Sequence, residues 1–555
     1  MKDLARMHPL TNLLLENRNI LDADEKLRFI APDYERDSHD PFLILNMERV
    51  VERILRAMKN EEKIIIYGDY DCDGIPGSVI LHDLFKKIGY AHFSNYIPHR
   101  HHEGYGLNKE AIINFAKGGV SLIVTVDCGI TDVPEVTLAN ELGVDVIITD
   151  HHLPQAILPP AYAILNSKQA DDHYPDDMLC GAGVAFKLSQ AILLRGNFAH
   201  IPLGWEKWLL DMAGLSTIAD MVPLVKENRM LAYYGLKVLR KSPRPGLIAL
   251  LKEAGTFQFE LTEEDVGFTI GPRINAASRM DVPLRAFELL ATDDVVFAKE
   301  RAKFLSNLNN ERKSEVARMV KEAMQHLEER TLQAVIVIGN PKWKVGVAGI
   351  VANKIAEHYN RPTFVWGKEG SSIIKGSCRS DGRINLVELM CAVPDGVFLD
   401  KGGHEFSGGF SISPEYIHTL EDQLTLAHGG MPKKEKPEVN YTVDTELTVR
   451  DVNERTYLAI TQLAPFGVGN PKPHFFFRGV IIVSVEMFGK EKNHLKLVLT
   501  DAFGGRTHAI GFFMTPESFP LIDVSSGKKI DLVATFEKSF FRGRPELRLR
   551  IVSIS

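Results

Sequence analysis

The sequence predicts an α/β protein: a doubly wound parallel-sheet domain, a long connecting helix, a second α/β domain and an all-β barrel at the C-terminus. Three observations support this prediction. Short apolar runs alternate with helical patterns between residues 63 and 149, as in parallel sheets covered by helices on both faces. Residues 293–330 are rich in charge and contain no glycine or proline, which indicates one long helix. Beyond residue 440, short strand-like runs end at glycine-containing turns, which is typical of a small barrel.

The domain organisation follows from the same patterns. A chain of 555 residues is long enough for roughly three or four domains. The stretch GGMPKKEKP at 429–437 has the composition of a linker. We expect a lead-in at 1–42, the main α/β domain at 43–225, a helical connector at 226–330, the second α/β domain at 331–428 and the barrel at 438–555.

The main domain shows the periodicities of alternating helices and strands. Leucine, methionine, valine and isoleucine recur at helical spacing between residues 43 and 58, which predicts an amphipathic helix ahead of the sheet. We expect strands at 63–67, 91–97, 121–127 and 144–149, and helices at 76–88 and 133–142.

Composition excludes several classes of protein. With 45% hydrophobic and 25% charged residues, the chain reads as an ordinary globular protein. The N-terminus MKDLARMHPL lacks the apolar core of a signal peptide, and no apolar stretch is long enough to span a bilayer. The five cysteines form no CxxC pair, so neither a disulfide framework nor a zinc knuckle is indicated. We therefore expect a cytoplasmic protein without membrane contact. A net charge of −7 argues against a wholly basic nucleic-acid coat but leaves room for a local basic track.

The stretch KIIIYGDYDCDGIPGS at 63–78 places three aspartates directly after an apolar strand. Burying the neighbouring carboxylates of Asp69, Asp71 and Asp73 would cost free energy unless a cation or solvent compensated their charges. The D-x-D-x-D-G spacing also opens the calcium loop of an EF-hand. That alternative fails because the loop requires a glutamate at its twelfth position, which here is Ile80. A solvated acidic turn stays possible for this stretch taken alone.

Two further strands end in polar residues. Strand 121–127 ends on Asp127, and strand 144–149 is followed by Asp150, His151 and His152. Any one of these could cap a helix, but the carboxyl ends of parallel strands meet at one sheet edge, where ligands bind. Asp220, in TIADMVPL, follows a run that could pack beneath the same edge.

This set of side chains predicts a metal site. Carboxylates with one or two imidazoles suit Mn²⁺ or Mg²⁺ better than a metal that prefers thiolates. Two such ions, about 3.5–4 Å apart and bridged by a shared carboxylate, commonly activate water for phosphoester cleavage. The residues thus predict metal-dependent phosphoester hydrolysis.

Several ordered motifs resemble a known family. The triplet Asp150-His151-His152 follows GDYDCDG and VTVDCGI, as in the DHH phosphoesterase superfamily. The similarity continues through PHRHHEGYGLN (98–108), LCGAGVAFKL (179–188), STIADMVPL (216–224) and GPRINAASRM (271–280). GSCRS (376–380) and GGHEFSGGF (402–410) look like the DHH-associated domain. Together, from about residue 60 onward, they resemble the RecJ family of bacterial single-strand-specific exonucleases.

The resemblance implies a set of metal ligands and one further catalytic residue. Asp127 would bridge two ions, and His152 would sit beside the scissile phosphate as an electrophilic partner or proton donor. Many superfamily members have a ligating histidine where this chain has Tyr67, so Asp69 or water would complete the first shell here. The remaining implied ligands are Asp71, Asp73, His151 and Asp220.

The resemblance also implies substrate contacts. Guanidinium forks suit phosphate because they bond its oxygens in pairs. A surface ion pair is the alternative for any one arginine. His99, His101 and His102 are interpreted as loop or DNA-facing residues rather than a metal site. The implied contacts are Arg100, Ser377 and Arg379 for the terminal 5′-phosphate, Arg273, Asn275 and Arg279 for the backbone near the scissile bond, and Gly402, Gly403 and His404 on the opposite wall.

The barrel resembles the oligonucleotide-binding fold that RecJ proteins carry. Residues 526–550 contain seven Lys or Arg against three acidic residues, interleaved with Phe536, Phe540 and Phe541. Basic groups follow phosphates and aromatic rings stack on bases, so this segment predicts a single-strand track. An ordinary barrel with a basic rim is the alternative.

These expectations combine into one functional hypothesis. We expect a 5′→3′ exonuclease that degrades single-stranded DNA to 5′-mononucleotides with Mn²⁺ or Mg²⁺, in DNA recombination and repair. Two alternatives remain: a small-substrate DHH phosphodiesterase (an oligoribonuclease, cyclic-dinucleotide phosphodiesterase or pyrophosphatase) and a non-catalytic replication scaffold. The resemblance further implies work with a helicase and a single-strand-binding protein. We also expect a monomer.

Overall fold

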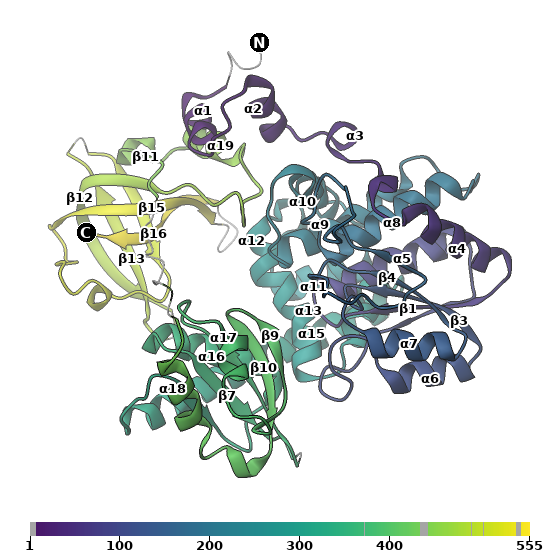
Figure 1. Cartoon of the computed structure of the whole chain (residues 1–555). Helices are drawn as coiled ribbons and strands as arrows, with labels where there is room; N and C mark the ends of the chain where they lie inside the picture. The colour runs from purple at the N-terminus through teal and green to yellow at the C-terminus, as the bar shows by residue number, and fades with distance from the viewer. Residues whose placement is uncertain are drawn as a thin grey trace.

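The computed structural model describes residues 7–370, 372–432, 434, 442–489, 491–502, 504–539 and 545–555. Phe540 and Phe541 lie outside these ranges, as does part of the expected linker at 429–437. Three sheets form three lobes, and helix α15 runs between two of them (Figure 1). The predicted fold class is confirmed. Within the described ranges, every helix is too short or too polar to cross a lipid bilayer.

The first lobe is built on a five-stranded sheet, in the order β2-β1-β3-β4-β5, whose strands are all parallel. Successive side chains of a strand point to opposite faces. Ile64 and Ile66 of β1 therefore pack beneath α4, α5 and α8, while Ile65 and Tyr67 pack beneath α6 and α7. The elements are β1 (Lys63–Gly68), β2 (Phe93–Tyr96), β3 (Val120–Val126), β4 (Asp145–Thr149), β5 (Ala163–Leu165), α4 (Met47–Lys59), α5 (Gly74–Ile88), α6 (Lys109–Lys117), α7 (Val133–Glu141) and α8 (Gly181–Arg195).

A layer of helices extends this lobe. Helices α9 and α10 cross at Gly214 and Gly235, where a Cβ on Gly214 would lie 2.5 Å from the Cα of Gly235. Only glycine permits so close an approach. The elements are α9 (Leu210–Ala219), α10 (Lys226–Leu239), α11 (Pro245–Ala254), α12 (Glu263–Asp265), the π-helical turn η5 (Val266–Ile270), α13 (Gly271–Met280), α14 (Leu284–Ala291) and α15 (Val295–Glu328).

Helix α15 connects the first lobe to the second. Asp294 caps its N-terminus by accepting hydrogen bonds from the amides of Val296 and Phe297. Its C-terminal half packs through Met319 and Leu327 on the second lobe, whose mixed sheet has the order β6-β7-β8-β10-β9. The elements are β6 (Ile336–Gly339), α16 (Val345–Tyr359), β7 (Thr363–Gly367), β8 (Ile374–Arg379), α17 (Leu386–Cys391), β9 (Phe398–His404), β10 (Ser407–Ile412) and α18 (Leu420–Gly429).

The third lobe is a barrel. Its sheet runs β11-β12-β13-β14-β16-β15, and the pairing of β12 with β15 closes it. Closure leaves no open sheet edge among the five strands of the barrel wall. The elements are β11 (Thr445–Glu446), α19 (Glu454–Thr461), β12 (Phe475–Phe488), β13 (His494–Thr500), β14 (Arg506–Gly511), β15 (Lys529–Ser539) and β16 (Glu546–Ile554).

The N-terminal segment joins two lobes. Helix α1 (Pro9–Glu16) buries Leu10, Leu14 and Leu15 in the barrel core, although it stands at the far end of the sequence. Each fully buried leucine contributes roughly 1.5–3 kcal/mol relative to exposure. Helices α2 (Ala23–Ile30) and α3 (Tyr34–Asp37) then lead the chain back to the first lobe (Figure 1). The segment expected as a lead-in is thus a strap between the first lobe and the barrel.

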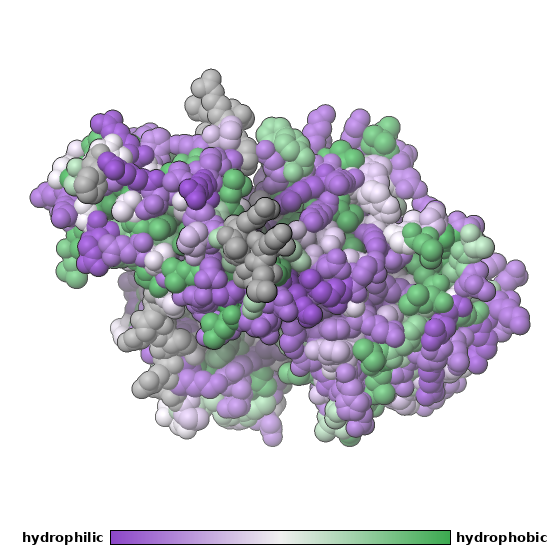
Figure 2. Space-filling view, turned by 90° about the horizontal axis from the view of Figure 1, so that it is seen from above, coloured by the Kyte–Doolittle hydropathy of each residue, from purple (hydrophilic) through white to green (hydrophobic). Residues whose placement is uncertain are grey.

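The surface seen from above is mainly hydrophilic. Figure 2 shows purple groups over most of this face, with hydrophobic groups scattered between them. The large apolar side chains of the strands lie instead in the buried clusters of the three lobes.

Candidate active site

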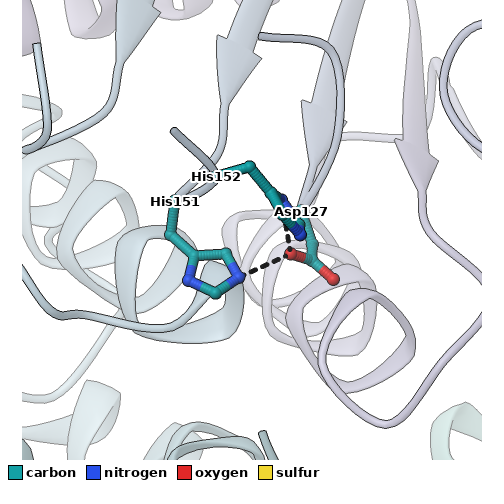
Figure 3. Close-up of side chains that lie close together, drawn as sticks. All are labelled: Asp127, His151 and His152. Carbon is teal, nitrogen blue, oxygen red and sulfur yellow. Dashed lines mark ion pairs between the residues drawn. The ribbon is translucent and has the colours of Figure 1, made fainter. Parts of the chain in front are cut away.

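The polar side chains predicted to meet at one sheet edge do meet. Asp127 follows β3 with a left-handed φ of 62°, an uncommon conformation for a residue other than glycine. Its amide donates to the carbonyl of Thr149, which fixes this turn against the end of β4. His151 and His152 come directly after β4 and point toward Asp127 (Figure 3). The strand ends thus hold all three side chains together.

His151 stands at the centre of the cluster. Its Nε2 lies 3.2 Å from Oδ1 of Asp127, 3.6 Å from Oδ2 of Asp73 and 3.7 Å from Oδ2 of Asp220. Burial lowers the pKa of His151, which favours the neutral imidazole that binds metals. Three groups of side chains offer ligand atoms within 4.8 Å of one another: Asp127–His151–His152, Asp73–His151–Asp220 and Asp69–Asp71–Asp127.

The shared members indicate two adjacent cation sites. Asp127 belongs to two of the groups and His151 to two, so the groups are joined rather than separate. Because Asp127 belongs to two of the groups, it is the candidate for the bridging carboxylate. The roles of the individual ligands stay predictions.

The buried carboxylates of the cluster repel one another, so a bound cation would stabilise them. Burial, then repulsion from Asp73 and Asp71, raises the pKa of Asp127 well above its usual value. Burial and Asp73 raise the pKa of Asp220 to about 9. One carboxylate oxygen each of Asp69 and Asp127 is buried with no hydrogen-bond partner in the described part of the chain. Orphaned carboxylate oxygens beside an imidazole fit a hard divalent cation such as Mn²⁺ or Mg²⁺.

The geometry bears on the open question at Asp69. Tyr67, at the position where the resemblance implied a histidine, points to the other face of the sheet, and its hydroxyl donates to the carbonyl of Gly106 at 2.9 Å. Tyr67 therefore cannot contribute to the cluster. Asp69 is 3% exposed and belongs to a candidate group with Asp71 and Asp127. The arrangement favours Asp69 as a ligand.

Helix α8 orients Asp73. The amides of Gly181 and Ala182 donate to the two oxygens of Asp73 at 2.6 and 2.8 Å. The positive end of a helix stabilises a carboxylate in this position. A Cβ on Gly181 would lie 2.5 Å from the Cβ of Asp127, so glycine also makes room for the bridging residue. The motif LCGAG thus has a positioning role that its sequence alone did not indicate.

Asp150 orients His152 and belongs to none of the three groups. It is fully buried, and its Oδ1 accepts from Nδ1 of His152 at 2.8 Å. Burial opposes a low pKa for Asp150, but the bonds from His152 and from the amide of Ile130 outweigh it and lower the pKa. For His152, burial acts to lower the pKa and the bond to Asp150 acts to raise it. The pKa of His152 is raised on balance. Since Nδ1 is held by Asp150, Nε2 is the ring nitrogen that this bond leaves available.

Tyr105 was not anticipated from the sequence. Its hydroxyl donates to the carbonyl of Asp127 at 3.0 Å and lies 3.0 Å from Nδ1 of His152. Tyr105 thereby links the residues that follow β3 and β4. An aromatic residue within a glycine-rich loop is too common a pattern to have singled it out.

Four arginines from four segments lie near one another, and three of them, Arg100, Arg279 and Arg379, were predicted to bind phosphate. Arg100, in the loop after β2, lies over the ring of Tyr70 at 4.9 Å. Burial, then repulsion from Arg100, Arg312 and Arg379, lowers the pKa of Arg279 to about 10. None of these four arginines forms an ion pair with a carboxylate in the described ranges. Unpaired and mutually repelling, they suit an anionic ligand.

Helix α15 adds cations that the sequence interpretation missed. Arg312, with Asn275 and Arg279, lines a pocket of about 180 Å³ between α13 and Ile350 of α16. The amide oxygen of Asn275 is buried without a partner among the described residues. Lys313 is close enough to Arg273 and Arg312 for their charges, after burial, to lower its pKa. Both missed residues lie in the charged stretch 293–330, which the sequence predicted only as a long connecting helix.

The second lobe places its predicted residues on neighbouring strands. Ser377 and Arg379 share one face of β8, and a Cβ on Gly349 of α16 would lie 2.9 Å from Nη2 of Arg379. The strand register sets Ser407 of β10 opposite both Arg379 and His404. Gly402 and Gly403 precede His404 on the edge strand β9.

Comparison with known proteins identifies the family. The chain matches the DHH family, N-terminal domain, over residues 63–215, the DHHA1 domain over 331–426 and the RecJ OB domain over 443–553. The single-stranded-DNA-specific exonuclease RecJ of Bacillus subtilis (strain 168) is 36% identical over 553 residues, which cover 99% of this chain and 68% of that protein. The exonuclease RecJ of Haemophilus influenzae is 32% identical over 560 residues, 98% of this chain and 96% of that protein. The chain belongs to the RecJ family.

The RecJ fold extends over nearly the whole chain. The crystal structure of RecJ from Thermus thermophilus, in complex with Mn²⁺, superposes with a TM-score of 0.79 at 25% identity. The match covers 99% of this chain and 76% of that one. The predicted resemblance is confirmed, and the matched domains follow one another in the predicted order.

The predicted single-strand track of the RecJ-type barrel needs correction. Phe536 is 4% exposed and packs on Phe475 inside the barrel, because it falls on the inward-facing positions of β15. Phe536 is therefore a core residue rather than a stacking platform. Several of the expected basic groups are neutralised by ion pairs, which join Lys528 to Asp523, Lys538 to Glu454 and Arg548 to Glu537.

A different ring stands out on the barrel surface. Phe513 is 79% exposed and has a left-handed φ of 56°, and its amide donates to Nδ1 of His494 at 3.0 Å. The rings of Phe513 and His494 lie 4.7 Å apart. Strain held by a specific hydrogen bond at an exposed aromatic residue points to a function.

Proposed function

We propose that this protein is a metal-dependent 5′→3′ exonuclease that degrades single-stranded DNA to 5′-mononucleotides. The observation that carries the proposal is the joined pair of carboxylate–histidine groups, centred on Asp127 and His151. Beside it lies a cluster of arginines that have no carboxylate partner among the described residues. Membership of the RecJ family, whose named relatives are single-stranded-DNA-specific exonucleases, supports the substrate and the reaction.

The first part of the proposed reaction is metal binding by the carboxylates and His151. Two divalent cations, Mn²⁺ or Mg²⁺, when bound would supply a more acidic water and charge stabilisation. The side chains that would hold them are those of Asp69, Asp71, Asp73, Asp127, His151 and Asp220. Asp73 is held ready by the N-terminus of α8 and therefore needs little reorganisation.

His152 is placed to act on the phosphate. Asp150 holds Nδ1, so Nε2 of His152 is free to face a scissile phosphate and donate a hydrogen bond or a proton. The raised pKa of His152 favours the protonated form that such a donor needs.

The 5′→3′ direction of degradation would be set by the arginine cluster. A terminal phosphate carries more charge than an internal one, so Arg100, Ser377 and Arg379 would select the phosphorylated 5′ end. Arg273, Asn275, Arg279 and Arg312 would hold the next phosphates. Binding through backbone contacts reads no sequence, and a cleft matched to one strand would exclude duplex.

Small-substrate hydrolysis is the alternative that shares this metal cluster. The RecJ OB domain at 443–553 favours a long single strand, because a small substrate would not need it. Retention of every predicted ligand position disfavours a non-catalytic scaffold.

Digestion of single-stranded DNA labelled at either end, and of a matched duplex, with Mn²⁺, Mg²⁺ or EDTA tests the proposal. We expect labelled mononucleotide first from the 5′ end, only on single strands and only with metal. Release from the 3′ end, equal cleavage of duplex or activity in EDTA would each contradict it.

The cellular setting extends the proposal. We expect a monomer that takes single strands from a helicase and a single-strand-binding protein during recombination and repair. Light scattering of the purified protein and pull-down with those two partners would test this, and a stable dimer or an absence of binding would contradict it.

A further inference from the structure

A second pocket, lined by none of the candidate metal ligands, lies where three parts of the chain meet. It has a volume of about 570 Å³ and is bounded by helix α2 of the N-terminal strap, by residues 225–229 at the start of α10 and by Gly469 of the barrel lobe. Sites for drug-sized ligands commonly have volumes of about 300–1,000 Å³. We call it the junction pocket.

Arg229 is the buried cation of the junction pocket. It is 3% exposed and donates to the carbonyls of Phe29 at 2.8 Å, Ala464 at 3.1 Å and Pro465 at 3.4 Å. Its guanidinium also lies 3.7 Å from the ring of Phe29. Across the described residues, Arg229 has no carboxylate partner. A buried charge without a counter-ion is costly, so an anion in the pocket would stabilise this arrangement.

The other cations of the pocket reinforce this charge. Arg18 lines the same pocket, and its only carboxylate neighbour in the described ranges is Asp444, at 3.7 Å. Burial and the charge of Arg18 together lower the pKa of Arg229 to about 9. Arg28 and Lys226 lie on the exposed rim and make no ion pair with any described residue.

The acidic residues of the lining do not cancel this charge. Glu227 is engaged by the buried Lys187, whose Nζ lies 2.9 Å from it, and by the hydroxyl of Tyr174. Asp37 is paired with Arg36. Glu25 alone has no ion-pair partner among the described residues, against three cations: Arg28, Lys226 and Arg229.

Apart from His39 and the charged residues already named, the wall of the pocket is apolar. Ile20, Pro32, Pro175 and Val225 line the pocket beside the cations. A ligand that matches both surfaces has a compact anionic group joined to a flat or weakly polar body.

We propose that the junction pocket binds a nucleoside 5′-monophosphate, with the phosphate at Arg229, Arg28 and Lys226 and the base against the apolar wall. The ligand chemistry does not depend on the proposed nuclease activity. Because the strap, α10 and the barrel lobe all contribute to the wall, a bound nucleotide strengthens the attachment of the barrel to the first lobe.

Calorimetric titration of the full chain with thymidine 5′-monophosphate, in EDTA, tests the proposal. The Arg379→Ala background removes the expected terminal-phosphate contact near the metal cluster, so that binding there is suppressed. In this background we expect one remaining site, competed by inorganic phosphate and weakened at least tenfold by Arg28→Gln with Lys226→Asn. Asparagine at 226 tolerates the left-handed φ of 48° at that position. Lys117→Gln, on the exposed last turn of α6, is the matched control and should leave the affinity unchanged.

Four outcomes would overturn the proposal. Loss of all binding in the Arg379→Ala background would place the nucleotide at the metal cluster alone. An unchanged affinity in the Arg28/Lys226 double variant would exclude the junction cations. Thymidine binding as tightly as its monophosphate would show an apolar site only. Equal competition by an oligothymidylate without terminal phosphates would assign the pocket to the path of a DNA strand.

Discussion

Nε2 of His151 lies 3.2 Å from Oδ1 of Asp127, although the two residues follow different strands of the sheet. The contact joins the candidate metal groups into one site. It depends on the left-handed turn at Asp127, which brings the carboxylate back over the end of β4. Most of the testable consequences of the structure follow from this relationship.

Replacing Asp127 by asparagine should abolish activity and stabilise the metal-free protein. Asparagine keeps the shape and tolerates a left-handed φ, so the fold is preserved. We expect the nuclease rate to fall by more than about 100-fold, the upper end of what losing a residue behind a metal ligand costs. The unfolding temperature in EDTA should rise because a buried repelling charge is gone. A variant with the wild-type rate would refute the bridging role.

Asp69→Asn tests whether Asp69 contacts metal. We expect the affinity for Mn²⁺, measured by calorimetry, to fall because a neutral amide replaces a buried carboxylate, one oxygen of which has no hydrogen-bond partner among the described residues. Tyr67→Phe removes only a hydroxyl on the other face of the sheet and is the matched control. Wild-type Mn²⁺ affinity in Asp69→Asn would show that water, rather than Asp69, completes the shell.

The metal-free protein should lose stability as pH rises. The folded-state pKa values of Asp69, Asp127 and Asp220 are raised, that of Asp220 to about 9, from unfolded values near 3.8. The folded state therefore binds more protons than the unfolded state, so stability is fullest below about pH 4 for these groups and is lost toward pH 9. Thermal unfolding in EDTA between pH 5 and 9 measures this, and Mn²⁺ should flatten the dependence. A rising unfolding temperature over that range would contradict the prediction.

Arg312→Gln should weaken binding of single strands at every sequence. Loss of one phosphate contact reduces the slope of log affinity against log salt by about 0.7 for a single strand. Arg318→Gln is the control: Arg318 lies on the same helix but is paired with Glu315 and Glu322. Fluorescence anisotropy with labelled oligothymidylate in EDTA measures both variants. Equal salt slopes for the two would remove Arg312 from the substrate path.

Phe513→Ala should weaken binding of long strands and spare short ones. Stacking of one base on an aromatic ring is worth roughly 1–3 kcal/mol, or about 5- to 150-fold in affinity. Leu521→Ala removes an apolar side chain that is 95% exposed on the same barrel and should have little effect. If Phe513→Ala and Leu521→Ala bind a long oligonucleotide equally, Phe513 is not a stacking residue.

Much of the first lobe could be predicted because its signals are local. The strands 63–67, 121–127 and 144–149 are short apolar runs, and the structure has strands there within one residue at each end. Chain direction alone places Asp127 and His151 at the same edge of a parallel sheet. The long helix at 293–330 could be predicted because this stretch contains no glycine or proline, and the structure has α15 there.

Other features depend on contacts that the local sequence does not encode. Phe536 and Phe513 look alike in sequence, yet one lies inside the barrel and the other is exposed. Which side chains of β15 point into the barrel is set by its pairing with β12, a strand that comes well before it in the chain. The sequence around the leucines of α1 likewise does not predict that they pack in the barrel core.

The sequence by itself determined the strand-end carboxylates, the imidazoles and the order of the domains, because strand direction and hydrophobic periodicity act over a few residues. Only the tertiary structure decided that Arg100, Arg279 and Arg379 face one another, and that Arg229 is buried where the strap, α10 and the barrel lobe meet. These arrangements bring together side chains from distant segments, and the burial that holds them there exists only when the lobes pack.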